Sequence, residues 1–402
     1  MNTQEEEIKP RILIFSLTYL PFIGGAEIAV KEITSRFANE FEFDLITARL
    51  DRKLSSEEML GNLRVYRVGK GKLSKYLFPW LALKKAKELH QKNSYQIVWG
   101  IMAFWAGWAA LKFKEKFPRV KYLLTLQSGD SDSFIKRRTW FWRWRYKQIY
   151  QKADRIQVIS SWLAKRARKY GYQGKIDLVP NGVNLSINKK QLTTNKIRRL
   201  RNNLKIRDKE KIVLTVSRLV KKNNIEDLIK AYKLLVTSHK LQAVLLIIGS
   251  GPLKSKLQNL VKKLMLQDKV VFINNVPYED LPGYYALADV FVRPSLSEGF
   301  GNVFIEAMAA GVPIIATPVG GILDFLKEGE TGWFCKVKNP QSIKEKVQYV
   351  LDDKNKEEVN RVVANARKMV EEEYDWDKIT EKMREIFTTL SRPHDRGIDI
   401  PW

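Results

Sequence analysis

The sequence contains a single cysteine, Cys335, among its 402 residues. A lone cysteine cannot form a disulfide within the chain, and disulfides are typical of oxidising compartments, so we expect a protein of the reducing cytoplasm. The first residues, MNTQEEEIKPR, are acidic and polar, whereas a secretory signal is basic and then apolar. These absences argue against a secreted protein stabilised by disulfides.

Long hydrophobic runs are also lacking. The longest run of apolar residues, IVWGIMAFWAGWAAL at residues 97–111, is shorter than the roughly 20 residues that a helix needs to cross a bilayer. We interpret it as a buried strand over residues 97–101 that leads into a buried helix. Low-complexity tracts are missing too, and a hydrophobic content of 45% is ordinary for a globular protein. The sequence therefore argues against an integral membrane protein.

Acidic residues are scarce relative to basic ones. Seventy-one Lys and Arg face 44 Asp and Glu, which leaves a formal net charge of +27. Such a field attracts polyanions or an anionic membrane surface. The alternative is a general lysine bias spread over solvated helix faces, and composition alone leaves both readings open.

Short β-rich runs alternate with helical patterns along the first half of the chain. Apolar residues recur at helical spacing after the first of these runs, at Ala26, Ala29, Val30, Ile33 and Phe37. Apolar strands that alternate with helices indicate a parallel sheet covered on both faces. The strand candidates of this half are RILIFSLTY, FEFDLITA, LRVYRV, YQIVWGI, VKYLLTL and RIQVIS.

A second α/β series begins at KIVLTVS and continues through AVLLIIG, VVFI, DVFVRPS and PIIAT. A polar stretch with the turn formers Asn181 and Gly182 separates the two series. The sequence therefore predicts an α/β protein with two Rossmann-like, doubly wound parallel-sheet domains, at residues 1–187 and 188–375. We expect the C-terminal helix and tail, residues 376–402, to pack back on the first domain.

Several glycine-rich turns follow predicted strands. In open parallel α/β sheets, ligands bind beyond the carboxyl ends of the strands, where these turns lie. The turns are PFIGGAE, IIGSGP and SEGFGN. Glycine lets backbone amides approach a ligand closely, and a helix N-terminus favours phosphate. None of them is a GxGxxG dinucleotide fingerprint, and the GSG of the second turn is equally consistent with a plain tight turn.

The stretch SEGFGNVFIE at residues 297–306 is more specific. Glu298 lies in the turn, where its carboxylate can accept hydrogen bonds from the hydroxyls of a ligand. We expect the following helix to run from about Asn302 to Ala310, because Gly311 is a suitable C-terminal cap and Pro313 follows it.

Glu306 is predicted to lie one turn into this helix, beside its apolar stripe and on the same side as Asn302. The two glutamates then bracket a helix N-terminus that can hold a phosphate. A ligand with hydroxyls at both ends and phosphate between them is a nucleotide sugar. The alternative, that Glu306 is a solvated helix residue, is not excluded by spacing alone.

At this point the sequence resembles a known family. The stretch PSLSEGFGNVFIEAMAAGVPIIATPVGGILDFLKEGETGWFCKVKNP is similar to the donor-binding signature of the retaining GT-B glycosyltransferases, specifically glycosyltransferase family 4 (group 1). GGAE, VPNGV, VSRLVKKNNIEDLIKAY, IIGSGP and NNVPYEDLPGYYALADVFVRPS match as well, in the order of the family. The resemblance spans nearly the whole chain and implies the fold and the reaction type.

In that family the C-terminal domain binds the nucleotide sugar and the N-terminal domain binds the acceptor. The resemblance implies that Glu298 binds hydroxyls of the donor sugar, that Glu306 binds those of the ribose, and that Arg218 holds the diphosphate. Further donor-binding positions are implied for the base pocket, for phosphate or sugar contacts and for the glycine turns. They are Gly24, Gly25, Gly249, Val276, Pro277, Phe300, Gly301, Asn302 and Val303.

The chain departs from the family pattern at two places. Many members carry a histidine near the donor sugar where this chain has Gln127, and Asp130 offers a nearby polar group on the acceptor side. The usual lysine after the diphosphate-binding arginine is replaced by Asn223, with Lys222 one place earlier. We therefore assign catalysis to Arg218, Lys222 and Glu298, and expect Lys221 to be a solvated neighbour. The histidines, His90, His239 and His394, lie elsewhere.

The segment RRTWFWRWRYKQIY at residues 137–150 mixes cations with aromatic side chains. As one helix it would spread its aromatics around the circumference, which fits a buried helix with a basic edge. Tryptophan, tyrosine and arginine together also suit a membrane interface, where a lipid-linked acceptor would lie.

The resemblance thus implies a retaining glycosyltransferase that moves a sugar from a UDP- or GDP-sugar to a glycan, glycolipid or lipid-linked acceptor, in cell-surface polysaccharide or glycolipid synthesis. It implies no metal and no cofactor, and a cytoplasmic or peripheral membrane location. The alternatives are a GT-B phosphorylase, for which no lysine is marked to hold pyridoxal phosphate, and a basic nucleic-acid-binding protein. The second leaves Glu298 and Glu306 unexplained, so we expect no nucleic-acid partner.

Overall fold

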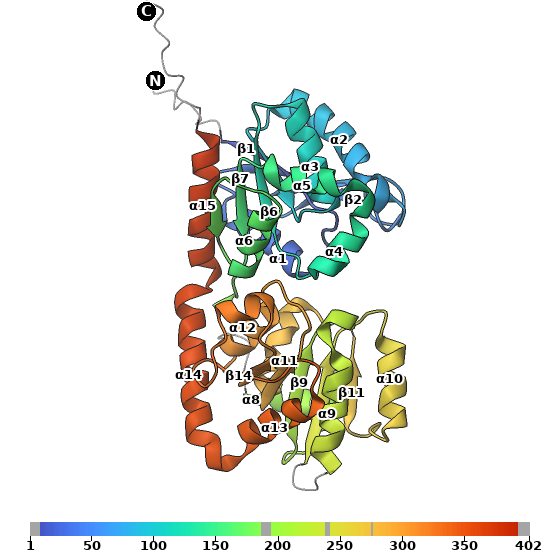
Figure 1. Cartoon of the computed structure of the whole chain (residues 1–402), viewed down its shortest axis with the longest axis vertical. Coiled ribbons are helices and arrows are strands. Elements are labelled where there is room, and N and C mark those ends of the chain that lie inside the picture. The colour runs from blue at the N-terminus through green and yellow to red at the C-terminus, as the bar shows by residue number, and fades with distance from the viewer. Residues whose placement is uncertain (1–8, 186–193, 238–241, 275, 393–402) are drawn as a thin grey trace, which may run out of the picture. The chain divides into compact units, whose positions relative to one another are not determined.

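The computed structural model describes residues 9–185, 194–237, 242–274 and 276–392, which fold into two compact units (Figure 1). The first unit contains the described residues up to Ser128, then Ser133–Pro180 and the described residues from Asp377 onward. The second unit contains Gly129–Asp132 and Asn181–Trp376. The boundary that we predicted near residue 187 lies outside the described residues. No helix in these ranges is both long and apolar enough to cross a membrane.

The first unit is built on an eight-stranded sheet with the order β3-β4-β2-β1-β5-β6-β7-β8. All neighbouring strands are parallel except β3, which pairs antiparallel with β4 at one edge. The strands are β1 (Arg11–Phe15), β2 (Glu42–Ala48), β3 (Glu57–Leu60), β4 (Leu63–Val68), β5 (Ile97–Ile101), β6 (Lys121–Leu126), β7 (Arg155–Val158) and β8 (Ile176–Leu178). Strand β5 is buried at every position, as its uncharged sequence predicts.

Helices connect these strands and cover the sheet (Figure 1). They are α1 (Gly25–Arg36), α2 (Ser74–Asn93), α3 (Trp105–Lys116), α4 (Asp132–Arg138), the 3-10 helix η1 (Trp140–Trp142), α5 (Arg143–Gln151) and α6 (Ser161–Lys169). The last helix of the described ranges, α15 (Trp376–Ser391), joins the same unit, because Phe387 packs edge-on against Phe37, Phe41 and Phe43 and against Trp99.

The second unit is built on a six-stranded, fully parallel sheet with the order β11-β10-β9-β12-β13-β14. Its strands are β9 (Lys211–Val216), β10 (Ala243–Ile248), β11 (Val270–Ile273), β12 (Val290–Arg293), β13 (Ile314–Ala316) and β14 (Trp333–Phe334). The chain order reverses between β9 and β12, so the carboxyl ends of these two strands flank the switch point at which such sheets bind ligands.

The described helices of the second unit are α8 (Thr194–Asn203), α9 (Ile225–Thr237), α10 (Lys254–Lys263), α11 (Leu281–Leu287), α12 (Asn302–Ala309), α13 (Pro340–Leu351) and α14 (Lys356–Glu373). Short 3-10 turns lie at η2 (Lys221–Asn223), η3 (Tyr278–Asp280), η4 (Gly320–Asp324) and η5 (Asp353–Asn355).

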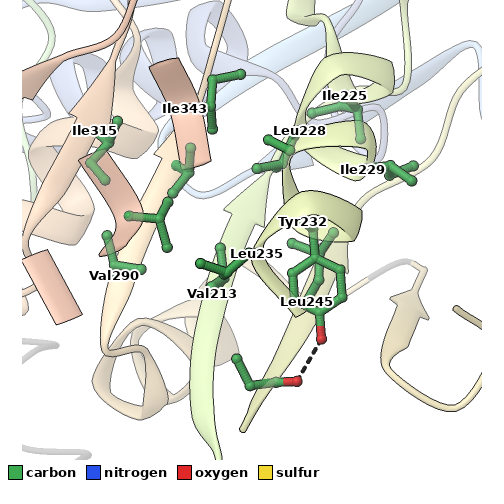
Figure 2. Packing of buried hydrophobic residues seen from close by; sticks show 14 of the residues in the cluster. Val213, Ile225, Leu228, Ile229, Tyr232, Leu235, Leu245, Val290, Ile315 and Ile343 are labelled. Carbon is green, nitrogen blue, oxygen red and sulfur yellow. Dashed lines mark hydrogen bonds between the residues drawn. The ribbon is translucent and has the colours of Figure 1, made fainter. Parts of the chain in front are cut away.

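The core of this unit lies between the sheet and the apolar face of α9 (Figure 2). Ile225, Leu228, Ile229 and Leu235 of α9 are buried at the spacing expected for one face of a helix. Tyr232, on the same face, donates its hydroxyl hydrogen to the carbonyl of Ala243 at 2.5 Å, so its one polar atom is satisfied inside the core.

The predicted α/β architecture with two doubly wound parallel sheets is confirmed. The expected strands are all present, as is the strand–helix transition at residues 97–111. Three short edge strands, β3, β8 and β14, were not predicted. Residues 137–150 do not form a single helix, because the chain breaks at η1 between α4 and α5.

Candidate donor-binding site in the second unit

The predicted turn and helix at residues 297–311 are confirmed. Helix α12 runs from Asn302 to Ala309, with Ala310 as its C-cap and Gly311 at a φ of +76°. The N-cap, Gly301, has a φ of +99°, a left-handed conformation that side chains disfavour. A Cβ atom there would also lie 2.6 Å from the Phe304 ring. Glycine at this position therefore allows the turn that carries Glu298 to enter the helix.

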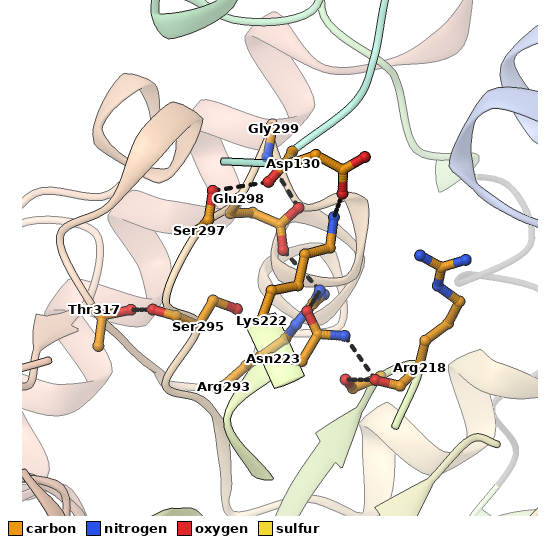
Figure 3. Close-up of polar contacts among 12 residues, drawn as sticks. Asp130, Arg218, Lys222, Asn223, Arg293, Ser295, Ser297, Glu298, Gly299 and Thr317 are labelled. Carbon is orange, nitrogen blue, oxygen red and sulfur yellow. Dashed lines mark hydrogen bonds and ion pairs between the residues drawn. The ribbon is translucent and has the colours of Figure 1, made fainter. Parts of the chain in front are cut away.

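Glu298 is held by a buried arginine from the neighbouring strand end (Figure 3). Arg293, the last residue of β12, donates from one guanidinium nitrogen to Glu298 Oε2 at 2.6 Å. The other carboxylate oxygen, Oε1, accepts the Gly299 backbone N–H at 3.1 Å. Both side chains are largely shielded from solvent. Each carboxylate oxygen has a second lone pair, so both can still accept a hydrogen bond from a ligand hydroxyl.

Arg293 is itself fixed from two further sides. It donates to the side-chain oxygen of Asn223 at 3.1 Å, and its guanidinium lies 5.7 Å from the centre of the Phe304 ring. Asn223 in turn donates to the backbone carbonyl of Arg218 at 2.7 Å. The asparagine that occupies the usual lysine position is thus buried and joins the end of β9 to the end of β12 through Arg293.

The cations predicted to meet a diphosphate differ in exposure and in their polar contacts, and the contacts are drawn in Figure 3. Arg218 is exposed, and no hydrogen bond or ion pair of its guanidinium is found within the described ranges. Lys222 is partly buried and pairs with Asp130 at 3.4 Å, while its carbonyl accepts the Leu296 N–H at 2.7 Å. Lys221 is exposed, as predicted for a solvated neighbour. Lys222 is therefore tied to the loop that carries Glu298, and Lys221 is not.

Glu306 lies in a pocket at the other end of the predicted site. The pocket is lined by Val183, Asn184, Tyr278, Leu281, Pro282, Tyr285 and Glu306. The hydroxyl of Tyr285 donates to Glu306 Oε2 at 2.7 Å. Because the glutamate is only 7% exposed, the alternative that it is a solvated helix residue is wrong. Val276 and Pro277, predicted to bind the base, precede the pocket residue Tyr278 directly.

Burial raises the pKa of Glu306 to about 7 from its ordinary value of 4.5, although the Tyr285 hydrogen bond and the charge of Arg293 act in the opposite direction. Burial also raises the pKa of Tyr285 well above its usual value, with the Glu306 carboxylate as the next cause. Tyr285 therefore remains a hydrogen-bond donor throughout the neutral range. A ligand that brings further donors to Glu306 stabilises its charged form.

The N-terminus of α12 is connected to the segment predicted to link the two domains. Asn181 is buried and donates from its amide to the side-chain oxygen of Asn302 at 3.1 Å. Phe300 is buried against the rings of Phe325 and Tyr374, so its side chain faces the core and only its backbone is available for a ligand. Val303 lies in the first turn of the helix.

The glycine turn after β10 has a structural reason as well as a predicted functional one. Gly249 has a φ of +132°, and a Cβ atom there would lie 2.0 Å from the carbonyl oxygen of Ser217. The turn contacts the chain after β9 through a hydrogen bond from Leu219 N to Ser250 O at 2.8 Å. Contact of Gly249 with the donor stays a prediction.

Three predicted residues belong to the first unit. Gly24 is the N-cap of α1 and Gly25 is its first residue. Gln127 follows the end of β6, at the carboxyl edge of the first sheet. Each occupies the edge expected for a ligand-binding residue, and their contacts with donor or acceptor stay predictions.

Four further residues contact the predicted site or line its pocket, and none was assigned a role from the sequence. They are Arg293, Asn223, Tyr285 and Tyr278. Arg293 had a detectable signal, because a charged residue at the end of the apolar strand DVFVRPS is unusual unless it is paired. The two tyrosines had none, since aromatic residues near a helix are most often core.

No cluster of three or more His, Cys, Asp or Glu side chains suited to a metal ion is found among the residues that the structure describes. His90 lies in the first unit against Phe117, and burial lowers the pKa of its imidazole. His239 and His394 are outside the described ranges.

Two family models match the chain in succession. The model described as Glycosyltransferase Family 4 matches residues 23–187, and the model described as Glycosyl transferases group 1 matches residues 196–369. The two matches correspond in sequence order to the two α/β series.

Individual proteins match over nearly the whole chain. An uncharacterized glycosyltransferase of Methanocaldococcus jannaschii is 30% identical over 94% of this chain and 97% of its own. The structure of sucrose-phosphate synthase from Thermosynechococcus elongatus has a TM-score of 0.82 at 25% identity, over 95% of this chain and 99% of its own. Anabaena HepE in complex with UDP-glucose has a TM-score of 0.77 at 17% identity, over 94% and 99%. The chain is therefore a glycosyltransferase with the GT-B fold and belongs to glycosyltransferase family 4, the group 1 glycosyltransferases.

Proposed function

We propose that this glycosyltransferase takes its sugar from a UDP- or GDP-sugar bound in the second unit. The observation that carries the proposal is the pair of carboxylates on one turn and helix. Glu298 lies on the side of the exposed Arg218 and the partly buried Lys222, and Glu306 lies in a pocket with two tyrosines. In this arrangement Glu298 can bind the sugar, the cations can meet the diphosphate, and Glu306 can bind the ribose of the nucleoside. The solved complex of HepE with UDP-glucose supports this reading by its shared fold.

The cations have a defined task in the proposed reaction. The bond between the anomeric carbon and the diphosphate oxygen breaks, which leaves an oxocarbenium-like sugar and new negative charge on the diphosphate. Arg218 and Lys222 stabilise this charge more in the transition state than in the bound donor, usually the largest contribution to catalysis. Lys222 must exchange its pairing with Asp130 for the diphosphate.

We further propose that the anomeric configuration is retained. The acceptor hydroxyl attacks from the side that the diphosphate leaves, and its proton passes to the departing phosphate oxygen. The new bond joins the acceptor oxygen to the anomeric carbon. Glu298, fixed by Arg293 and the Gly299 N–H, orients the sugar through its hydroxyls during this step.

For the acceptor we propose a glycan, glycolipid or lipid-linked molecule bound by the first unit, with Gln127 on the acceptor side. Asp130, which the sequence also assigned to the acceptor side, belongs to the second unit, where it pairs with Lys222. Such an acceptor places the enzyme in cell-surface polysaccharide or glycolipid synthesis, at the inner face of the membrane. Neither a phosphorylase nor a nucleic-acid-binding role is favoured by a specific observation.

A thermal-shift screen of nucleotide sugars tests the donor directly. A ligand present at about 100 times its Kd stabilises the folded protein by roughly 2.7 kcal/mol, which is a readily measured shift. We expect one nucleotide sugar to stabilise the protein more than its free nucleoside diphosphate does. Stabilisation by none of the UDP- or GDP-sugars would contradict the proposal.

The identified donor then allows turnover to be followed with and without EDTA, and the anomeric configuration of the product to be read by NMR. Because Arg218, Lys222 and the α12 N-terminus are proposed to meet the diphosphate, we expect turnover to survive chelation and the configuration to be retained. Loss of turnover that magnesium or manganese restores, or an inverted product, would contradict the mechanism.

A further inference from the structure

The first unit carries an aromatic surface that the proposed donor site does not use. Three elements contribute to it: the first turns of α2, the start of α3, and η1 with the start of α5. We call it the aromatic ridge, and it consists of Tyr76, Trp80, Trp105, Trp108, Trp140, Phe141, Trp142 and Trp144.

The ridge is continuous at its centre. Trp142 stacks on Trp105 with ring centres 5.7 Å apart and on Trp108 at 5.0 Å. Tyr76 meets Trp105 edge-on at 6.1 Å, and Trp80 meets Trp108 edge-on at 5.0 Å. Three segments that are distant in the sequence are thus joined into one surface by ring contacts within a single unit.

Its outer members face solvent to an unusual degree. Trp140 is 69% exposed, Phe141 is 86% exposed and Trp144 is 63% exposed. Leu73 and Leu77 beside Tyr76 are more than half exposed as well. Trp140 and Phe141 contact each other with ring centres 4.2 Å apart, and both they and Trp144 lie within two residues of Trp142 in the chain. Single exposed apolar residues are ordinary, but several exposed aromatic side chains next to a stacked cluster indicate an interaction surface.

The charge around the ridge is predominantly positive. One acidic residue of α3, Glu115, lies beside it and forms an ion pair with Arg145 at 2.5 Å. Residues 70–80 and 133–147 contain the nine cations Lys70, Lys72, Lys75, Lys136, Arg137, Arg138, Arg143, Arg145 and Lys147, and neither segment contains an Asp or Glu. Several of the basic side chains lie on the rings themselves, with Lys112 Nζ 5.4 Å from the Trp80 ring centre and Arg145 beside Trp144. The partner of this surface must therefore be anionic and must accept aromatic rings.

We propose that the aromatic ridge docks the first unit on the interface of an anionic lipid bilayer. Tryptophan and tyrosine favour the headgroup region, where the apolar ring meets acyl chains, and lysine and arginine can place their stems along apolar surface while the charge meets lipid phosphates. The inference concerns binding to the bilayer and does not rest on the donor or the reaction proposed above. It goes beyond the segment at residues 137–150, since α2 and α3 supply half of the rings.

Vesicle co-sedimentation of the full chain tests the proposal. Vesicles of phosphatidylcholine with phosphatidylglycerol should sediment the protein at low salt and release much of it as salt screens the contacts, whereas pure phosphatidylcholine vesicles should retain little. Binding of the nucleotide sugar, measured on the same samples, is expected to be unaffected by vesicles. A protein that binds the nucleotide sugar but no vesicles would contradict only the bilayer proposal, and one that binds vesicles but no nucleotide sugar would contradict only the proposed donor.

Two variants separate the ring contribution from the charge contribution. The triple variant Trp140→Ala, Phe141→Ala, Trp144→Ala should lower the partition coefficient about tenfold or more. Its matched control removes three exposed apolar residues of the second unit, Leu234→Ala, Met265→Ala and Leu323→Ala, and should bind like the unmodified protein.

The charge variant Arg137→Gln, Arg143→Gln, Lys147→Gln should likewise weaken binding to anionic vesicles. Its control replaces the exposed Lys262, Lys263 and Lys269 of the second unit by glutamine, and should weaken binding much less. Unchanged melting temperatures establish that each variant is folded.

Three results would overturn the proposal. One is equal binding to neutral and anionic vesicles, or binding to neither. Another is a ring variant that sediments like the unmodified protein. The third is a different occupant: dimers that the ring variant abolishes, or a single-stranded oligonucleotide retained at salt concentrations that release the vesicles, would assign the ridge to a second copy or to nucleic acid.

Discussion

The two glutamates of the proposed donor site have the same side chain and contrasting surroundings. Glu298 faces a guanidinium and a backbone N–H, with Arg293 at 2.6 Å. Glu306 faces the hydroxyl of Tyr285 at 2.7 Å, inside an otherwise mostly apolar pocket, and burial raises its pKa to about 7. One carboxylate has a charged partner in the protein, and the other has a neutral one.

This difference indicates how each part of the site is prepared for its ligand. A carboxylate that is already paired and hydrogen-bonded is fixed in position, as catalysis requires of a group that orients the reacting sugar. A carboxylate with one neutral partner is stabilised when a ligand supplies more donors, as two ribose hydroxyls would. In the proposed assignment, the carboxylate that orients the sugar is fixed before the ligand binds, and the carboxylate that meets the nucleoside is stabilised by binding.

Removing Arg293 is expected to have the largest effect, because it takes away the charged partner of Glu298. Arg293→Met leaves Glu298 as a buried carboxylate without its cation, which typically costs about 3–5 kcal/mol of unfolding free energy. Urea unfolding measures this loss. Adding Glu298→Gln to the same chain should restore part of the stability but no turnover. A single variant as stable as the unmodified protein would show that the pair does not hold Glu298.

Removing Lys222 is expected to affect the proposed reaction without disturbing the ion pair between Arg293 and Glu298. Lys222→Ala should lower turnover by about two decades, on the order of 3 kcal/mol of lost transition-state stabilisation. Lys221→Ala is the matched control, since this exposed neighbour should cost far less. Steady-state kinetics with the identified donor measures both. Equal and small losses would mean that another cation meets the diphosphate.

The contribution of Glu306 to the free energy of unfolding is expected to depend on pH. Because the folded pKa of Glu306 is raised to about 7, the folded protein binds more protons than the unfolded chain between about pH 4.5 and pH 7, so the free energy of unfolding falls as pH rises through this window. The contribution of this one group is on the order of 3 kcal/mol. Glu306→Gln should remove it and be the more stable protein at pH 8. Parallel pH profiles of the two proteins would contradict the assignment.

A smaller change tests the role of the Tyr285 hydroxyl, the neutral partner of Glu306. Tyr285→Phe removes one buried hydrogen bond to Glu306 and should weaken nucleoside diphosphate binding by about 1 kcal/mol. Tyr284→Phe, the adjacent and less buried tyrosine, serves as control. Isothermal titration calorimetry measures both dissociation constants. If the two variants bind alike, the Tyr285 hydroxyl does not prepare Glu306.

Local patterns predicted much of this molecule. The strands of both sheets are recognisable as apolar runs, and helix α12 from its glycine turn and its Gly311 cap. The edge strand β3, with the sequence EEML, was missed because it is short and acidic, and its pairing with β4 gives it a conformation that its residues do not specify. Edge strands depend on their neighbours more than on their own pattern.

The partners of the two glutamates were not predictable for a related reason. The contact of Arg293 with Asn223 spans 70 residues, and it exists because β12 lies beside β9 in the sheet although β10 and β11 intervene in the sequence. Tyr285 reaches Glu306 from another helix in the same way. The sequence indicated which residue types the site contains, and the strand order determined which of them meet.

We propose that Glu298 binds the sugar and Glu306 binds the nucleoside, and the dissociation constants of two ligands for two variants test both assignments. Glu306→Gln should weaken the nucleoside diphosphate and the nucleotide sugar alike, by about 1.5–3 kcal/mol, because both carry the ribose. Glu298→Gln should weaken the nucleotide sugar by a comparable amount and leave the nucleoside diphosphate unchanged. Equal losses for both ligands in both variants, or unchanged binding in both, would contradict the account.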